Sequence, residues 1–600
     1  MDILFFSGVP ILLLIGIIGI VLLVRGSQSS REEIPGIGTT RRVFLYGLAF
    51  IAIMLATTGI TMLLSSIVST LFTDDISRND SGQIAFGLAA VIVGFPLWAL
   101  LWHASAGSIL TYPAEAGSLA RKLHIYTVLL VSGVVVAFSA SSTIAELLED
   151  GGFDAAKLAA PLAWAVLWVI HWRWESAEGQ PSPTAISSRQ FYAYLSAAYG
   201  LVMLASGLGM LLYGLLNETY SALFQHAIGG HESLWNDNTR SALANGLAIG
   251  LIGGVWWWFH WHRVSAGDHS SSPRLAVSYA LGIFGGMITT ITGISIFVFS
   301  ILNWFLGINH APAADYFDAL PAGLAITVVG VAVWVYYRLV AQDDANVSPA
   351  QATSAARVYR YLASAVGLGT LGIGIAIEIG LVVGLFADTG SHMVNGGRWW
   401  ATPLSISLTL ILVGGTLWVR HWLMLQARAD ATDLSERTAQ SRRIYIFSIF
   451  GIAVLVTLIA ASVVLFRVLL ATLDGDLNAE VFNDVKYGIG IVAAAGVISS
   501  YHRRVLKEDR GIEAAAQPPE PASHVPKLIT VVAPGGASAV IDRMEAKVGI
   551  RFSVWERRDD AKVPTLSDEH VDAIANAIAT ASGQRVLLLI DSNGVQVIPV

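Results

Sequence analysis

The sequence contains about thirteen long apolar runs separated by short polar stretches, and this pattern leaves few folds open to the chain. At a helical rise of about 1.5 Å per residue, each run can cross a hydrocarbon layer about 30 Å thick. The composition agrees, because 54% of the 600 residues are hydrophobic and only 13% are charged. The mean hydropathy of +0.62 is also far above that of soluble domains. We therefore expect an all-α polytopic membrane protein.

The apolar runs indicate one lone helix followed by six hairpins. The first run, residues 3–24, lacks a basic leader and a small-residue cleavage site, so we interpret it as a retained helix. Each hairpin has a longer helix that starts with a basic residue and a tyrosine, such as Arg42 and Tyr46, then a polar loop and a shorter helix, at a period of about 80 residues. The predicted boundaries are 1–40 for the N-terminal helix and loop, then 41–120, 121–188, 189–273, 274–356, 357–441 and 442–512 for the hairpins.

The C-terminal part differs in composition. Alanine, proline and glutamine dominate residues 513–523, which indicates a flexible linker. Residues 524–600 are predicted to form a small soluble α/β domain. Strands are expected at 528–532, 550–555, 585–590 and 595–600, with helices ending near 548 and 580. About 77 residues suffice for one modest core but not for a deep active site.

The shorter helices end in a repeated aromatic and basic motif, most complete as Trp168, His171, Trp172 and Arg173. Tryptophan and basic residues gather where helices leave a membrane through the headgroup layer. We therefore expect the tryptophans of these endings to act as interfacial anchors: Trp98, Trp168, Trp172, Trp257, Trp261, Trp334, Trp418 and Trp422.

The distribution of cations predicts the orientation. Basic residues such as Arg41, Arg121 and Arg173 concentrate in the loops beside these endings, whereas the opposite loops are acidic or neutral. By the positive-inside rule, the endings and the C-terminus lie in the cytoplasm and the N-terminus lies outside. The expected location is the bacterial cytoplasmic (inner) membrane.

Composition excludes several kinds of function. The chain has no cysteine, so disulfides, thiolate metal sites, iron–sulfur clusters and covalently attached haem are ruled out. A net charge of -7 argues against nucleic acid as a partner. We identify no catalytic residues and predict no metal site and no cofactor, so we do not expect an enzyme. Lipids are the expected bound molecules.

Histidines leave one cofactor hypothesis open. His171, His260 and His421 occupy the same place in three hairpins, and paired imidazoles can ligate the iron of a b-type haem. The alternative interpretation is that each imidazole is an interfacial group between tryptophans. In the loop 217–240, His226 and His231 lie near acidic residues, but their spacing fits no tight metal-ligand pattern.

Three charges lie inside the predicted spans: Glu146, Glu378 and Arg467. An uncompensated charge near the bilayer centre costs about 3 kcal/mol on insertion scales. These residues either pair to fix how hairpins pack or form a transport or proton pathway. Hydroxyl-rich faces, such as Thr57 to Ser69, allow the same two interpretations.

The repeated Arg and Tyr start and the Trp-x-x-His-Trp ending resemble an uncharacterised bacterial family of polytopic membrane proteins. That family is built from tandem two-helix repeats and is grouped under a domain of unknown function. The resemblance covers about residues 41–507. The fourth hairpin departs from the pattern with Tyr337 and Arg338, and the sixth with Val497. The resemblance implies an architecture and assigns no residue roles.

These observations predict an integral membrane scaffold or an accessory subunit of a larger membrane assembly. Its partners are expected to be the bilayer and another membrane protein or further copies of the chain. A transporter or ion pathway that uses the intramembrane charges is the first alternative, and a b-type haem protein is the second.

Overall fold

The computed structural model describes residues 39–72, 81–149, 153–178, 185–225, 237–307, 312–387, 398–430, 434–516, 528–559, 561–581, 585–592 and 594–600. Twelve helices within these ranges are long and apolar enough to cross a membrane. The predicted helix at residues 3–24 lies outside the described residues. The chain divides into two compact units, Met1–Leu506 and Lys507–Val600, which are described separately.

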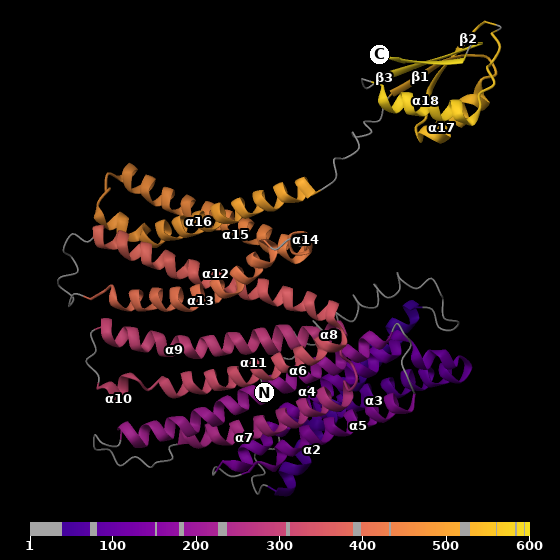
Figure 1. Ribbon diagram of the computed structural model, residues 1–600. Coiled ribbons are helices and arrows are strands. Elements are labelled where there is room, and N and C mark those ends of the chain that lie inside the picture. Colours follow the sequence, from indigo (N-terminus) through magenta and orange to yellow (C-terminus); the bar gives the residue numbers. More distant parts are fainter. Residues whose placement is uncertain are drawn as a thin grey trace. The chain divides into compact units, whose positions relative to one another are not determined.

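The first ten spanning helices of the first unit pack as five consecutive pairs (Figure 1). Hairpin 1 consists of α2 (Thr39–Phe72) and α3 (Ser81–Thr111). In hairpin 2, α4 (Leu119–Leu148) is followed by η3 (Ala155–Leu158) and α5 (Ala159–Ala177). In hairpin 3, α6 (Ile186–Tyr220) and η4 (Ser221–Gln225) are followed by α7 (Asp237–Trp258) and η6 (Phe259–Val264). A short turn of helix, η2 (Pro113–Gly117), joins hairpins 1 and 2.

The second half of this unit continues the pattern. In hairpin 4, α8 (Ser272–Leu275), η7 (Ala276–Gly285) and α9 (Gly286–Leu306) are followed by α10 (Ala313–Tyr316) and α11 (Leu320–Val347). In hairpin 5, α12 (Pro349–Ala387) is followed by α13 (Ala401–Asp430) and α14 (Leu434–Arg437). Hairpin 6 consists of α15 (Gln440–Asp474) and α16 (Ala479–Ala516). The longest of these helices exceed the bilayer core, so their ends extend into the polar layers.

Glycines let the two helices of a hairpin approach closely. A Cβ atom on Gly207 of α6 would lie 2.2 Å from the backbone nitrogen of Gly250 on α7, and one on Gly246 would lie 2.7 Å from the nitrogen of Leu211. Small residues at a spacing of four allow such contacts in lipid, where dispersion forces and close packing replace the hydrophobic effect. The packing interpretation of these glycines is therefore supported.

The second unit contains the predicted α/β domain. Its sheet has the strand order β2-β1-β3-β4, formed by β1 (Leu528–Pro534), β2 (Ser553–Arg557), β3 (Arg585–Asp591) and β4 (Gly594–Pro599). Strands β1, β2 and β3 are parallel, and β4 returns antiparallel to β3. Helices α17 (Ser538–Val548) and α18 (Asp568–Thr580) lie on one face of the sheet (Figure 1) and cover a core that includes Met544 and Leu588.

Substituting Gly207 tests the close approach of α6 and α7. We expect Gly207→Ala to lower the free energy of unfolding by about 1–3 kcal/mol, because the added methyl group must displace backbone. Gly209→Ala is the control, since its Cβ would meet nothing within 4 Å, and alanine favours helix by up to about 1 kcal/mol. Thermal unfolding in detergent measures both. Equal midpoints for the two variants would contradict the packing.

Candidate functional site

Each of the first five hairpins is closed at its polar end by an acidic side chain that binds residues from the start of the same hairpin. We call this arrangement the clasp. The acids and their partners are Glu115 with Arg42, Glu178 with Lys122, Asp268 with Tyr194, Asp344 with Arg274, and Glu436 with Arg357 and Tyr361. In hairpin 2, Glu175 adds a hydrogen bond from Tyr126 at 3.0 Å.

The clasp of hairpin 1 shows how the buried charge is satisfied. Glu115 is only 1% exposed and accepts two hydrogen bonds at Oε2 from Arg42, at 3.0 Å from Nε and 2.6 Å from Nη2. Ser118 donates to its other oxygen at 3.2 Å. Tyr46 shares a 2.9 Å hydrogen bond with Ser105. A carboxylate bonded on both oxygens has recovered the interactions that it had with water.

In the clasp of hairpin 4, a buried carboxylate is again bonded on both oxygens, but by different side chains. Asp344, also 1% exposed, accepts from Arg274 Nε at 2.8 Å on one oxygen and from His269 Nδ1 at 3.0 Å on the other. Because Asp344 lies in the last turn of the second helix and Arg274 opens the first, the pair locks the two helices in register.

Asp268, which lies in the loop after the second span of hairpin 3, shows the electrostatic consequence of a clasp. Burial raises the pKa of this carboxyl group, but hydrogen bonds from Ser271, Ser270 and Tyr194 together outweigh burial and hold the pKa below its usual range. The backbone nitrogen of Ser271 donates at 3.0 Å, and the Tyr194 hydroxyl at 3.1 Å. The charged form of Asp268 is therefore the form that the fold stabilises.

A second contact joins hairpins in twos. In three places, an arginine near the start of an even-numbered hairpin stacks on the last tryptophan of the preceding hairpin. The guanidinium carbon lies 4.4 Å from the ring centroid for Arg121 on Trp102, 4.8 Å for Arg274 on Trp261 and 5.7 Å for Arg442 on Trp422. We call this contact the Arg–Trp staple. Cation–π contacts of this kind strengthen when they are desolvated.

The tryptophans of the helix endings are more buried within the protein than their predicted role as membrane anchors requires. Trp261 is 4% exposed and Trp422 is fully buried, and the other six are half-buried. The indole nitrogens of Trp257 and Trp422 donate to Tyr337 at 3.0 Å and to Tyr501 at 2.6 Å. These rings therefore connect neighbouring hairpins. Their anchoring to the membrane stays a prediction.

The three candidate haem ligands are occupied in different ways. Each Nδ1 bonds the carbonyl oxygen four residues earlier, so Nδ1 carries the proton and Nε2 is an acceptor. Nε2 of His260 accepts from Tyr192 at 3.1 Å, and Nε2 of His421 accepts from Tyr359 at 3.2 Å. An acceptor already used by a hydroxyl has no free lone pair for iron, so these two residues lend the haem hypothesis no support. Nε2 of His171 is buried and has no partner among the described residues.

The three intramembrane charges lie apart. Glu146 forms an ion pair with Lys157 of the same hairpin, and Glu378 on α12 accepts a 2.5 Å hydrogen bond from Ser407 on α13. Arg467 on α15 is exposed. The structure therefore brings each of the two acids together with a partner in its own hairpin and does not join the three charges in one site.

Several hydroxyls of these faces are bonded within their own helices. Thr58, Thr61 and Ser66 each donate to the carbonyl four residues earlier, as do Thr289, Thr290 and Thr292. Among the described residues, no three His, Asp or Glu side chains form a group that could hold a metal ion. His226 and His231 lie outside these residues.

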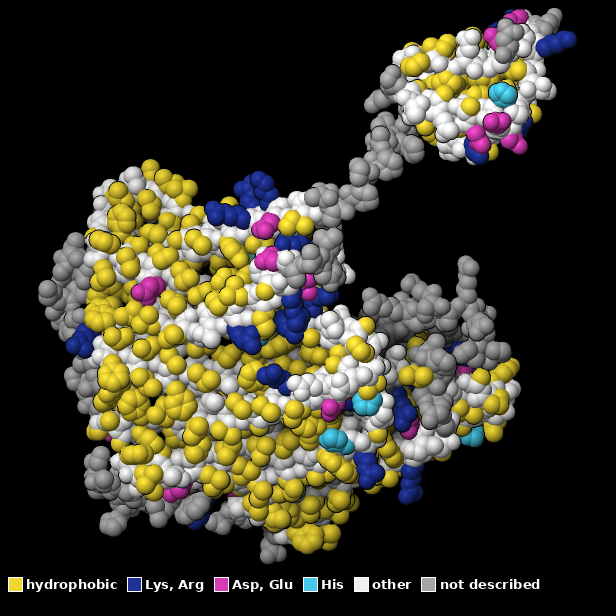
Figure 2. Space-filling view, viewed as in Figure 1, with side chains coloured by type: hydrophobic (Ala, Val, Ile, Leu, Met, Phe, Trp, Pro, Cys, Tyr) yellow, Lys and Arg dark blue, Asp and Glu magenta, His cyan; other side chains and the backbone are white. Residues whose placement is uncertain are grey.

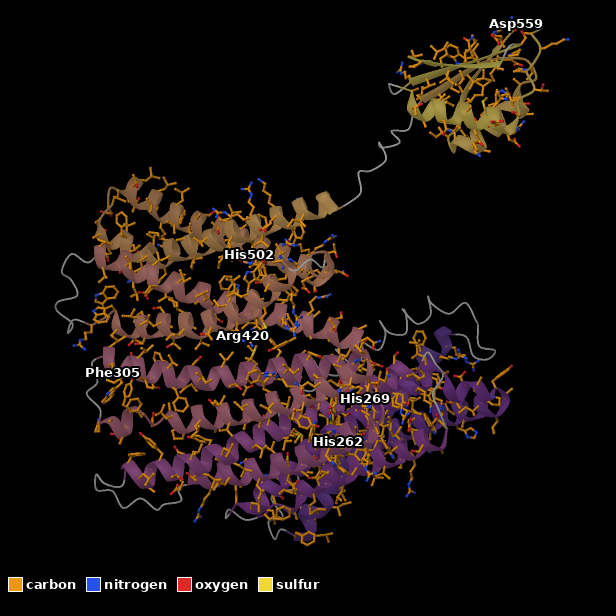
Figure 3. All side chains as sticks on the ribbon, viewed as in Figure 1. His262, His269, Phe305, Arg420, His502 and Asp559 are labelled. Atoms are coloured by element: carbon orange, nitrogen blue, oxygen red, sulfur yellow. The ribbon has the colours of Figure 1, made fainter. Side chains whose placement is uncertain are left out.

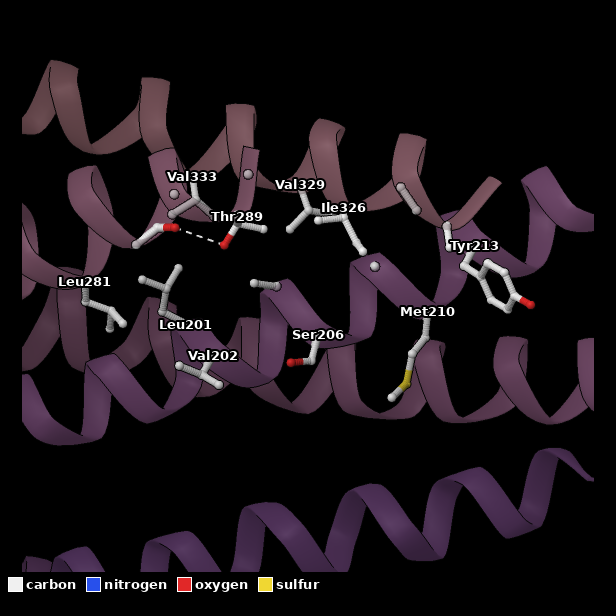
Figure 4. A pocket seen from close by; sticks show the side chains of 17 residues that line it. Leu201, Val202, Ser206, Met210, Tyr213, Leu281, Thr289, Ile326, Val329 and Val333 are labelled. Carbon is white, nitrogen blue, oxygen red and sulfur yellow. Dashed lines mark hydrogen bonds between the residues drawn. The ribbon is translucent and has the colours of Figure 1, made fainter. Parts of the chain in front are cut away.

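The described helices border two large cavities that we consider, each between neighbouring hairpins. One, of about 540 Å³, is bordered by α6, η7, α9 and α11, and Figure 4 shows its mainly apolar lining, with Leu201, Met210 and Val329. The other, of about 760 Å³, lies between hairpins 4 and 5, and its lining includes Arg338, Arg360 and Arg420. Figure 3 labels Arg420 on α13, the helix that packs beside α9.

Our sequence analysis did not identify the acids of the clasps or the arginines of the staples. A signal for them was present, because an acid follows each of the first five endings within about a dozen residues, as Glu115 follows His103 and Asp344 follows Arg338. Acids near helix ends are common, however, and only their burial beside a cation distinguishes these.

Asp344→Asn tests the clasp. We expect the free energy of unfolding to fall by about 3–5 kcal/mol, because Arg274 would lose its charged partner in a buried setting. The neighbouring Asp343 is exposed, so Asp343→Asn should change stability by at most about 0.5 kcal/mol. Chemical or thermal unfolding of the purified protein compares the two, and similar losses in both variants would contradict the clasp.

Comparison with known proteins agrees with this two-hairpin organisation. A family model described as a domain of unknown function, DUF5671, matches residues 42–170, 190–320 and 357–497. Each match begins at the first helix of an odd-numbered hairpin and runs into the following hairpin, so each includes one complete Arg–Trp staple. No curated protein and no solved structure matches the chain. With well over half of its length matched, the chain belongs to the DUF5671 family and carries that domain of unknown function three times in tandem.

Proposed function

We propose that this protein is a non-catalytic integral membrane scaffold or an accessory subunit of a larger membrane assembly. The clasp, repeated in five hairpins, carries the proposal. Each clasp uses its charged groups to hold two helices in register, which makes a stiff array of hairpins. Stiffness with repeated, outward-facing apolar surface suits a protein that positions others.

The distribution of polar groups supports this function over transport. Transporter sites usually form near the bilayer midplane, where broken helices bring polar groups together. In the described part of this chain, the ion pairs of the clasps in hairpins 1, 2, 4 and 5 lie at one end of each of these hairpins. Glu146 and Glu378 have partners within their own hairpins. Under the positive-inside orientation, the clasps lie on the cytoplasmic side.

Helix α15 is the most suitable surface for a membrane partner. Its span has the highest mean hydropathy of the twelve, 2.8, and only 6% of its most apolar window is buried, compared with 17–56% for the others. Leu455, Leu458 and Ile459 are among its exposed side chains. Lipid or another helix can cover this face, and the scaffold proposal requires a protein there.

Photo-crosslinking in native membranes tests the scaffold. A crosslinking amino acid at position 458 of α15 should capture a membrane protein, or a second copy of the chain, in a fixed ratio that survives purification in mild detergent. Position 251 of α7 is the control, because Leu251 is similarly exposed, at 55% compared with 63% for Leu458. A chain that purifies alone, with no crosslink from position 458, would contradict the proposal.

One specific observation, the position of Glu378, favours the alternative function, a proton pathway. This carboxyl group lies about 13 Å from the end of α12 by helical rise and contacts Ser407 across the hairpin, a position from which it could pass protons. The scaffold predicts that wild-type proteoliposomes pass protons no faster than empty vesicles, and that Glu378→Gln changes nothing. A pH-sensitive dye measures the flux. A wild-type flux that Glu378→Gln abolishes, while Glu146→Gln preserves it, would favour the proton pathway.

A further inference from the structure

The cavity between hairpins 4 and 5 has a polar end and an apolar end. At the polar end it is lined by Arg338 of α11 and by Arg360 and Arg420 of α12 and α13. The lining continues deeper along α9 and α13, through Ile294, Val298 and Leu412. From Ile283 to Val298 it follows about 22 Å of helix by the rise per residue. Its volume of about 760 Å³ is within the range of ligand sites.

The three arginines are not ion-paired with any acid among the described residues. In the parts of the chain that the structure describes, none of them forms an ion pair or a hydrogen bond, and Arg338 only stacks over Trp334 at 5.5 Å. Glu436, the acid of this hairpin's clasp, is already bonded to Arg357 at 2.9 Å and to Tyr361 at 2.9 Å. Figure 2 shows basic side chains set within a mainly hydrophobic face. Several like charges beside apolar surface favour an anion among them.

The interface between hairpins 2 and 3, which we call the first seam, has different side chains at the corresponding positions. We call the interface between hairpins 4 and 5 the second seam. Aligning the endings on His171 with Tyr337 and on His260 with His421 places Trp172 where Arg338 stands, and Phe259 where Arg420 stands. Trp172 packs on Phe259 with ring centroids 5.4 Å apart, and Trp168 packs on Trp256 at 5.8 Å. Aromatic rings therefore fill the first seam.

The second seam has arginine side chains where the first seam has aromatic rings. Arg360 stands where hairpin 3 has Ala193, and Leu417 stands where it has Trp256. Three large rings, Trp172, Trp256 and Phe259, are thus exchanged for Arg338, Leu417 and Arg420. The exchange leaves room between the hairpins, and three guanidinium groups line that room. The same framework thus closes one seam with protein and leaves the other for an anionic occupant.

We propose that this cavity binds one anionic phospholipid between hairpins 4 and 5. Arg338, Arg360 and Arg420 bind its phosphate, because guanidinium groups match phosphate oxygens in charge and geometry. Its acyl chains lie along the apolar part of the cavity beside α9 and α13. A basic pocket between helices at the cytoplasmic end of the spans is where anionic headgroups are recognised. The apolar length distinguishes this site from one for free phosphate.

The unfolding midpoint of the delipidated full-length protein, measured in detergent, tests the proposal. Phosphatidylglycerol should raise the midpoint, whereas phosphatidylcholine with the same acyl chains and inorganic phosphate should not. In R338Q/R360Q/R420Q, the apparent affinity for phosphatidylglycerol should fall by about tenfold or more, because charged hydrogen bonds are lost. The matched control R173Q/R503Q/R504Q removes three exposed cations at the same end of the spans and should keep the wild-type affinity.

A second variant covers the case in which the triple variant does not fold. L417W/R420F rebuilds the aromatic filling of the first seam, so it should remain folded and lose the response to phosphatidylglycerol. Three results would overturn the proposal: equal shifts with phosphatidylglycerol and phosphatidylcholine, the full shift with inorganic phosphate alone, or an equal loss of affinity in the control. Retention of the lipid response by L417W/R420F would overturn it as well.

Discussion

A carboxylate buried between apolar helices must be paired, and this requirement organises the polar end of every clasped hairpin. Glu115 and Asp344 are each 1% exposed, and both oxygens of each are bonded to side chains. Removing one partner would leave a charge in a setting that cannot solvate it. The clasp therefore selects one register between two helices whose apolar faces alone would tolerate sliding, and the remaining packing is built on that register.

The Arg–Trp staple adds the next level. Arg121, Arg274 and Arg442 each reach back to a tryptophan of the preceding hairpin, so hairpins associate in twos, as the three family matches also indicate. Because Arg274 also serves in a clasp, the two contacts are physically coupled there. The interfaces between successive pairs of hairpins differ more in their side chains. Aromatic rings fill one, and arginines surround a cavity in the other.

Much of the architecture could be predicted, because apolar length and turn chemistry are local properties. The strands and helices of the α/β domain appear near the expected residues, and Ser567 caps α18 by accepting a hydrogen bond from the backbone nitrogen of His570. The candidate site was less accessible to prediction. Glu146, Glu378 and Arg467 stand out as charges in apolar runs, yet the fold leaves them apart. Glu436, in a short polar stretch between two spans, proves to be buried on α14 and bonded to two residues.

The sequence by itself determined that the chain is a tandem array of apolar hairpins with a separate α/β domain, since hydrophobic length and repeat period need no knowledge of neighbours. Only the tertiary structure decided what the polar groups do. Trp422 is a plausible membrane anchor in the sequence, but the fold buries it between Arg442 and Tyr501. Arg420 has the same charge as any loop arginine, but its surroundings make it part of a cavity. The physical reason is that burial and pairing depend on segments far apart in the chain.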